Sequence, residues 1–262
     1  MSRRIHSISV SAIVIGALAA ACGGGGGTGT SSTSSGGSER PAATATADGP
    51  GVITGRISFE GEPPPRAPVR MAADPNCTPA EAQSLSETTI VAADGGLQNV
   101  FVHVKDGLGN RIYATPATPI KLDQLGCRYE PHVFGVFVGQ PVEIHNSDPT
   151  LHNVHAIPKE NDEFNFGQQP KTPPMIRMFD EPEIGVSFRC DVHGWMRAYA
   201  NVVTHPFFAV SKADGTFEIK GLPAGTYTIE AWHERLGTQT QQVTITDGAP
   251  AVTAAFAFKP AA

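Results

Sequence analysis

Short stretches in which apolar and polar residues alternate recur along the chain from about residue 51 onward. Such alternation is typical of β-strands that bury one face. Up to residue 204 it predicts strands over residues 52–59, 97–104, 120–122, 133–138, 142–146, 186–190 and 198–203. About seven or eight short strands with turns between them are typical of a Greek-key sandwich, so we expect an all-β fold.

A second series of strands follows from about residue 205. The pattern predicts strands over residues 207–210, 216–219, 227–232, 241–245 and 252–258. Tight turns at Asp214–Gly215 and around Gly225 separate them. Because so short a segment is marginally stable alone, we expect it to pack against the first series, with Phe207 and Phe208 at the junction.

The first 22 residues have the features of an export signal. Arg3 and Arg4 precede a short apolar stretch over residues 8–18, which is too short to span a bilayer. Ala19-Ala20-Ala21-Cys22 then resembles a bacterial lipoprotein box, which implies a lipid on Cys22 and a membrane-tethered mature protein. The alternative is plain secretion with an unmodified Cys22. Residues 23–50 are rich in Gly, Ser, Thr and Ala, and we expect a disordered linker there.

Composition agrees with a turn-rich β protein that is not directed to nucleic acid. Of 262 residues, 40% are hydrophobic and only 17% are charged, with 28 Gly and 22 Pro. The formal net charge is −6, and no run of basic residues follows Arg4. Since phosphate binding needs clustered Lys and Arg, we expect no nucleic-acid partner.

One short motif carries most of the chemistry. Cys190, His193 and Met196 have the spacing C-x2-H-x2-M, and His152 lies 38 positions before the cysteine (190 minus 152). A thiolate, two imidazoles and a thioether are the ligands of a blue-copper electron-transfer site, so we predict one mononuclear copper ion on these four residues. Asn153 is expected to join the two ligand loops by hydrogen bonds. The alternative has Cys190 in the core or a disulfide, His193 on the surface and Met196 in packing.

Other residues compete for parts of this site. Met175 and Met178 are alternative axial ligands, but neither lies in the cysteine loop. Further histidines leave a second metal site open, although we expect them to be ordinary surface or core residues: His103, His132, His145 and His155. We expect His193 to lie on an exposed loop and to be the exit for an electron, with Trp195 in an apolar docking patch.

The segments 142–148, 151–154 and 190–196 resemble the ligand segments of cupredoxins, and the short ligand loop is most similar to that of amicyanin-type members. Residues 126–237 are similar to bacterial methylamine-utilisation-like proteins with an attached carboxypeptidase regulatory-like domain. The resemblance implies a cupredoxin-like copper domain over residues 51–204. A small prealbumin-like, carboxypeptidase regulatory-like β-sandwich would follow over residues 205–262. A long early segment and Asp191 inside the ligand loop depart from the family pattern.

Two of the four cysteines remain once Cys22 is assigned to lipid and Cys190 to copper. In an exported, oxidising compartment, a Cys77–Cys127 disulfide is reasonable and would fasten the early segment to the sandwich. The alternative is a pair of buried thiols.

Together these features predict a membrane-tethered one-electron carrier of the cell envelope, facing the periplasm or the cell surface. It would exchange electrons with a partner protein and would not be an enzyme. Two other functions remain open: copper binding and delivery with the same ligands, and a carbohydrate-binding or structural surface lipoprotein.

Overall fold

The computed structural model describes residues 42–71, 74–77, 85–248 and 251–260. The expected export signal with Cys22, and the linker up to residue 41, lie outside the described residues. Residues 41–262 form a compact unit of their own. No helix in the described part of the chain is long and apolar enough to cross a membrane.

The prediction of an all-β fold is confirmed. The strands of the first half are β1 (Gly51–Phe59), β2 (Phe101–Asp106), β3 (Ile120–Gln124), β4 (Tyr129–Glu130), β5 (Val133–Phe137), β6 (Val142–Asn146), β7 (His152–Ile157) and β8 (Phe164–Gln168). Those of the second half are β9 (Met175–Arg177), β10 (Glu183–Arg189), β11 (Arg197–Val203), β12 (Phe208–Val210), β13 (Thr216–Leu222), β14 (Gly225–His233), β15 (Gly237–Ile245) and β16 (Val252–Phe258). A single 3-10 turn, η2 (Pro75–Cys77), accompanies them in the described residues.

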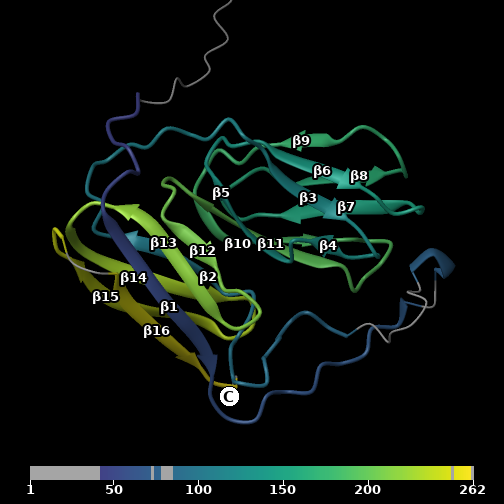
Figure 1. Ribbon diagram of the computed structural model, residues 1–262. Coiled ribbons are helices and arrows are strands. Elements are labelled where there is room, and N and C mark those ends of the chain that lie inside the picture. The colour runs from purple at the N-terminus through teal and green to yellow at the C-terminus, as the bar shows by residue number, and fades with distance from the viewer. Residues whose placement is uncertain (1–41, 72–73, 78–84, 249–250, 261–262) are drawn as a thin grey trace, which may run out of the picture. The chain divides into compact units, whose positions relative to one another are not determined.

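Strands β3 to β11 form the central lobe, which lies on the right in Figure 1. One of its sheets has the order β5-β11-β10-β7-β8, and the other has the order β4-β3-β6-β9. Strand β6 shows why they pack together: Val142 and Ile144 point inward, whereas Glu143 and His145 alternate with them toward solvent. Ile144 shares one buried apolar cluster with Phe188 of the other sheet, which closes the sandwich.

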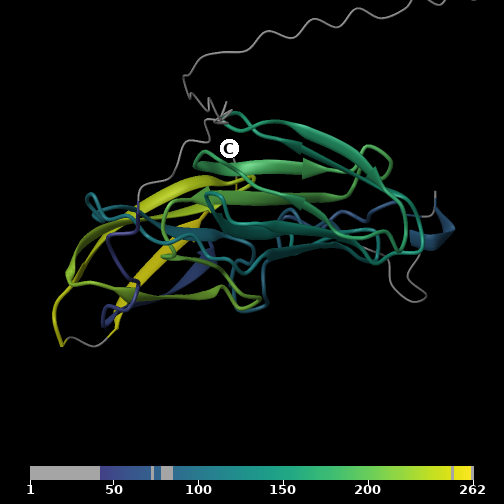
Figure 2. The same cartoon turned by 90° about the horizontal axis from the view of Figure 1, so that it is seen from above.

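Strands β1, β2 and β12 to β16 form the terminal lobe, seen beside the central lobe in Figures 1 and 2. Its sheets have the orders β13-β1-β16 and β12-β2-β14-β15. The expected boundary after residue 204 therefore does not separate the sheets, because β1 and β2 precede it and yet hydrogen-bond with strands that follow it. Both occupy interior positions, so the last five strands alone would leave each sheet divided.

The two lobes are joined by aromatic and polar contacts. Phe208 lies at the junction as expected: its ring is so close to Gly135 of β5 that any side chain at that position would collide with it. Nearby, the ring of Tyr199 meets Trp232 edge-on, with 5.5 Å between centroids. His132 Nε2 also lies 2.6 Å from Oε1 of Glu234. The expectation that the second series packs against the first agrees with these contacts.

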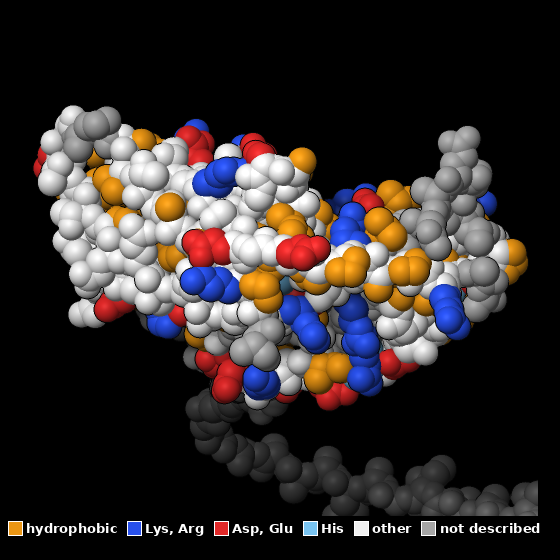
Figure 3. Space-filling model, turned by 90° about the horizontal axis from the view of Figure 1, so that it is seen from below, with side chains coloured by type: hydrophobic (Ala, Val, Ile, Leu, Met, Phe, Trp, Pro, Cys, Tyr) orange, Lys and Arg blue, Asp and Glu red, His pale blue; other side chains and the backbone are white. Residues whose placement is uncertain are grey.

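Part of the segment that was expected to be a disordered linker contacts the folded unit. The backbone N–H groups of Thr44 and Ala45 donate to the carbonyl of Ile112, at 2.8 and 3.0 Å, and Gly49 donates to Gly221 at 3.0 Å. Residues 44–49 thus use partners on the folded unit and do not belong to a disordered linker that ends at residue 50. On the face shown in Figure 3, basic and acidic side chains are interspersed with hydrophobic ones.

Candidate metal centre

Strand pairing brings the two ligand segments to one end of the central lobe. Cys190 directly follows β10, and His152 begins β7, its antiparallel neighbour, with Arg189 paired to His155. The loop after Cys190 folds back on itself: Met196 N–H donates to the His193 carbonyl at 2.9 Å, and Cys190 N–H donates to the Met196 carbonyl at 3.4 Å. Residues that are 38 positions apart (190 minus 152) therefore share one site.

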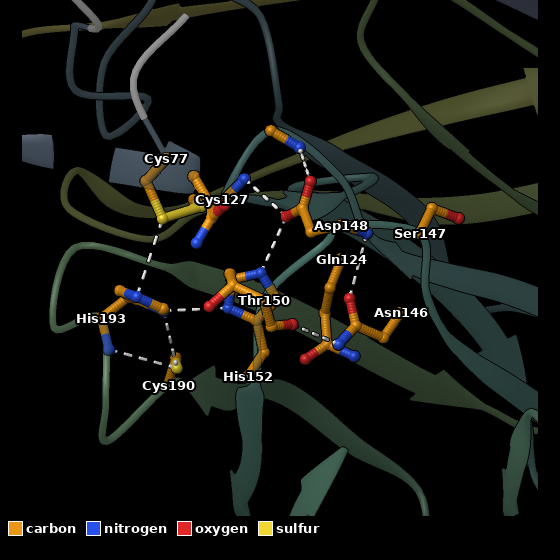
Figure 4. Close-up of polar contacts among 12 residues, drawn as sticks. Cys77, Gln124, Cys127, Asn146, Ser147, Asp148, Thr150, His152, Cys190 and His193 are labelled. Carbon is orange, nitrogen blue, oxygen red and sulfur yellow. Dashed lines mark hydrogen bonds and ion pairs between the residues drawn. A yellow bond between two sulfur atoms is a disulfide. The ribbon is translucent and has the colours of Figure 1, made fainter. Parts of the chain in front are cut away.

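Three of the predicted ligands meet at this site. Ligand-type atoms of His152, Cys190 and His193 all lie within 4.8 Å of one another, and we call these residues the ligand cluster (Figure 4). The two Nδ1 atoms are 2.9 Å apart, and Sγ of Cys190 is 3.9 Å from Nδ1 of His193. All three residues are buried, with exposed fractions of 0, 2 and 3%.

The three methionines considered as the fourth ligand differ in burial. Met196 lies in the ligand loop and is 1% exposed. Met175 in β9 is 36% exposed, and Met178 just after it is 56% exposed. Met196 is therefore the methionine that shares the buried environment of the ligand cluster.

The outer nitrogen of each imidazole contacts one carboxylate. His152 Nε2 lies 2.7 Å from Oδ2 of Asp148, and His193 Nε2 lies 3.2 Å from Oδ2 of Asp74. The backbone N–H of Asn76, followed by the Thr150 hydroxyl, lowers the pKa of Asp74 to about 2. Burial raises the pKa of Asp148, but hydrogen bonds from His152, Cys127 and Gly126 outweigh it, so its pKa is also lowered. Both carboxylates are therefore ionised.

This arrangement requires a cation inside the ligand cluster. An ionised carboxylate only accepts hydrogen bonds, so each Nε2 carries a proton, and a ring without a second proton presents the lone pair of Nδ1 inward. Two lone pairs that face each other at 2.9 Å repel unless a proton or a metal ion lies between them. A carboxylate behind each metal-binding histidine is the usual way to orient the ring, so the donor set fits a metal ion.

The electrostatics of the ligand cluster favour a thiolate. Burial raises the pKa of Cys190, but hydrogen bonds from His152 and from the backbone N–H groups of Asn153 and His193 lower it below its ordinary value. Burial lowers the pKa of His152, whereas Asp148 and Cys190 raise it to about 9. For His193, burial and the neighbouring His152 lower the pKa. His152 is therefore protonated at neutral pH in the absence of metal and must release that proton on metal binding, since a thiolate and a neutral imidazole are the forms that bind metal.

Asn153 and Tyr129 hold the two ligand-bearing strands together. Asn153 Oδ1 accepts from the backbone N–H of Asp191 at 3.0 Å, and its own N–H points at Sγ of Cys190 at 3.4 Å. The buried Tyr129 hydroxyl donates to the Asn153 carbonyl and lies 3.1 Å from that of Arg189. These contacts fix the position of Cys190 relative to β7.

The predicted disulfide is confirmed, and it lies against the ligand cluster. Cys77 and Cys127 are joined, with 5.3 Å between their Cα atoms. Cys77 Sγ lies 3.6 Å from Nε2 of His193, and the backbone N–H of Cys127 donates to Asp148 at 2.7 Å. Trp195 Nε1 donates to the carbonyl of Cys127 at 3.0 Å. The sequence indicates the cross-link but not its place beside the site.

The expectation that His193 is exposed is wrong. Residues 74–77, which we call the cover segment, lie over its outer edge, so His193 is only 3% exposed. Trp195 is partly buried, and the exposed apolar side chain of the ligand loop is Val192, at 55%. The cover segment lies over 100 positions from His193 in the sequence, and no local pattern connects them.

Asp148 and Asp74 were not predicted as parts of the site. Asp148 lies four residues before His152, and a carboxylate this close to a metal-binding histidine is a signal that could have identified it. Asp74 carries no such signal. Asp191, which departs from the family pattern, points away from the ligand cluster: its carboxylate contacts Nδ1 of His155 and Nε of Arg189, both at 3.0 Å.

The remaining candidate histidines have carboxylate partners. The pairs, with their closest distances, are His103–Glu230 at 3.3 Å, His132–Glu234 at 2.6 Å, His145–Glu143 at 3.4 Å and His155–Glu163 at 2.8 Å. Within the described residues, none of these histidines belongs to a group of three or more His, Cys, Asp or Glu side chains placed to share a metal ion.

Comparison with known proteins finds no matching family model and no matching curated protein. Solved structures that match are cupredoxin-type copper proteins. They include a copper-containing nitrite reductase from Thermus scotoductus (20% identity, TM-score 0.31, 37% of this chain and 24% of that one). A purple cupredoxin from Nitrosopumilus maritimus also matches, with 19% identity and a TM-score of 0.28, over 32% of this chain and 99% of that one. Amicyanin from Paracoccus versutus matches with 21% identity and a TM-score of 0.29, over 39% of this chain and 97% of that one. The chain thus spans about a quarter of the reductase.

Proposed function

We propose that the protein holds one copper ion and serves as a one-electron carrier. The ligands are Nδ1 of His152, Nδ1 of His193 and Sγ of Cys190, with the sulfur of Met196 as the fourth. The observation that carries this proposal is the pair of facing Nδ1 atoms, 2.9 Å apart beside a buried thiol. Two imidazoles with a thiolate and a thioether suit copper better than other common ions.

The residues around the ligand cluster keep it in one arrangement. When bound, copper supplies one-electron exchange between Cu(I) and Cu(II). Asp148 and Asp74 orient the two imidazoles, and Asn153 and Tyr129 fix the strand ends that carry them. Burial of the ligand cluster excludes water. With four protein ligands no coordination position is left for a substrate, so we propose a carrier and not an enzyme.

We further propose that this carrier is exported and tethered to a membrane through a lipid on Cys22. The disulfide supports an oxidising compartment. Its redox partner would be a protein that docks near Val192, the exposed apolar residue beside His193. Encounter surfaces of redox partners are small, which suits a single loop. The terminal lobe then has an accessory role.

Copper delivery uses the same ligands but needs rapid exchange. The cover segment and the nearly complete burial of the three ligands favour slow exchange. Transfer of copper to a chelator within seconds would support delivery, whereas retention over hours with reversible reduction would support the carrier.

The proposal is tested by loading the purified protein with Cu(II) and recording its visible spectrum. We expect one copper per chain and an intense thiolate-to-copper band. The band should disappear in Cys190→Ser and persist in Cys22→Ser, the matched control that removes a thiol outside the site. A colourless copper complex in the unaltered protein would contradict the proposal.

A further inference from the structure

The Cys77–Cys127 disulfide lies beside His193 and Asp148 (Figure 4). Cys77 forms one group of possible metal ligands with Asp74 and His193. Cys127 forms another with Asp148 and His152. In each group the ligand-type atoms lie within 4.8 Å of one another. Both cysteines of the cross-link thus have a carboxylate and an imidazole within reach of their sulfur atoms.

The separations around Cys77 match those of a tetrahedral metal site. Sγ of Cys77 is 3.6 Å from Nε2 of His193, and that nitrogen is 3.2 Å from Oδ2 of Asp74. Tetrahedral zinc would place sulfur and nitrogen ligands about 3.5 Å apart and nitrogen and oxygen ligands about 3.3–3.6 Å apart, because Zn–S is about 2.3 Å and Zn–N and Zn–O are about 2.0–2.2 Å, so only small shifts of these side chains are needed. The fourth ligand would be Sγ of Cys127, which the disulfide joins to Cys77 and which would turn toward Asp74 and His193 once the S–S bond opens.

We propose that reduction of this disulfide creates a second metal site, in which Cys77, Cys127, Asp74 and Nε2 of His193 bind a zinc-like divalent cation. A dithiol reductant breaks the S–S bond: it supplies two electrons and two protons and becomes a disulfide itself. The two new thiols then release their protons as they bind the cation. His193 keeps one proton, which moves from Nε2 to Nδ1 and faces His152.

Asp74 is the carboxylate that shares a group of possible ligands with Cys77 and His193. Asp148 instead accepts from Gly126 N–H, Cys127 N–H and Nε2 of His152, each at 2.7 Å. It therefore holds the backbone of Cys127 in place when the disulfide opens. Asp74 accepts from the backbone and side-chain N–H groups of Asn76 through Oδ1. Its Oδ2 accepts from the Thr150 hydroxyl at 2.8 Å and faces Nε2 of His193 at 3.2 Å.

This site differs from the proposed copper centre in its sulfur ligands and in the nitrogen of the His193 ring that binds the metal. Copper would use Nδ1 of His193 and Cys190, whereas the second site uses Nε2 and the two cysteines of the disulfide. A single imidazole has too few exchangeable protons to serve both ions without becoming an imidazolate, so the two sites compete for His193. The inference does not rest on copper binding, and its test contains no copper.

The test uses the full chain with Cys22→Ser and Cys190→Ser, so that Cys77 and Cys127 are the only cysteines left of four. Cd(II) is the probe, because its bonds to thiolates absorb in the ultraviolet. We expect no such band in the oxidised protein. After reduction with dithiothreitol and its removal under inert gas, we expect one Cd(II) per chain with a two-thiolate band.

Ligand variants on this background separate a built site from a loose pair of thiols. His193→Gln should weaken Cd(II) binding by about 10-fold or more, and Asp74→Asn should also weaken it. The matched controls are His145→Gln and Asp94→Asn. The His145 side chain contacts Glu143, and the Asp94 side chain contacts Arg56, so both variants should bind Cd(II) as before. Equal affinity in His193→Gln and His145→Gln would overturn the proposal, and so would loss of the near-ultraviolet dichroism of the fold on reduction.

Discussion

The middle of the terminal lobe and the ligand end of the central lobe are both buried, but they bury different groups. Between the sheets of the terminal lobe lie apolar side chains such as Ile53, Ile57 and Phe256. At the ligand end of the central lobe, Asp148 and His152 are buried to a similar degree. Polar groups are costly to bury unless they are hydrogen-bonded. The comparison teaches that alternating strands build both lobes, whereas the candidate metal centre lies where His, Cys and Asp side chains converge on one point.

The largest expected effect concerns the apolar middle. Ile53 is fully buried in β1, which pairs with both β13 and β16. Ile53→Ala should lower the free energy of unfolding by about 2–5 kcal/mol, because it removes buried methyl groups and leaves a cavity. Urea denaturation measures this change. Lys220→Ala, on the exposed side of β13, is the control and should change it little. Equal stability of the two variants would contradict the assignment of β1 to the core.

Acid should destabilise the protein through two other buried groups, the rings of His205 and His233. Burial lowers the pKa of both His205 and His233 from 6.5 to about 4, so both rings are neutral in the folded protein. An unfolded histidine takes up its proton at about pH 6.5. The stability contributed by the neutral rings is complete above pH 6.5 and is lost as the pH falls toward 4, by on the order of 3 kcal/mol for each.

Urea unfolding between pH 7.5 and pH 4.5 tests this loss. His233→Gln should show a shallower dependence on pH than the unaltered protein. His145→Gln is the control, because that ring is partly exposed beside Glu143. In this variant the stability should depend on pH as steeply as in the unaltered protein. A stability that stays flat over this range would contradict the burial of neutral rings.

A smaller effect is expected from the carboxylate behind His152. Asp148→Asn removes a charged acceptor that binds Nε2 of His152 at 2.7 Å. The affinity for copper should fall by about 10–100-fold, the usual cost of losing the group that orients a metal-binding histidine. Competition with a chelator measures this affinity. An unchanged affinity would mean that Asp148 does not orient the ring.

The smallest effect is expected from the carboxylate in the ligand loop itself. Asp191 also contacts a histidine, His155, but it is exposed and points away from the ligand cluster. Asp191→Asn should leave copper affinity unchanged and cost less than about 1 kcal/mol of stability, as is usual for exposed ion pairs. The pair of variants, at 148 and 191, thus compares two Asp–His contacts that differ in burial. A larger loss of copper affinity in Asp191→Asn than in Asp148→Asn would contradict the assignment of Asp148 as the carboxylate that orients His152.

The sequence predicted those features that depend on neighbouring residues. The spacing of Cys190, His193 and Met196 on one loop, with His152 placed 38 positions before the cysteine, indicated the ligand cluster, whereas the strand that His152 begins was not predicted. The partners of β1 and the position of Asp74 could not be predicted in this way. They depend on contacts across more than 100 residues, which leave no periodic trace in either segment. The burial of His193 follows from one of these contacts and was missed for the same reason.

X-ray absorption at the copper edge of the loaded protein tests the central claim most directly, because it reports which atoms bind the metal. The account predicts one short bond to sulfur and two bonds to imidazole nitrogen, with the short sulfur bond lost in Cys190→Ser. A copper ion surrounded only by nitrogen and oxygen in the unaltered protein would contradict it.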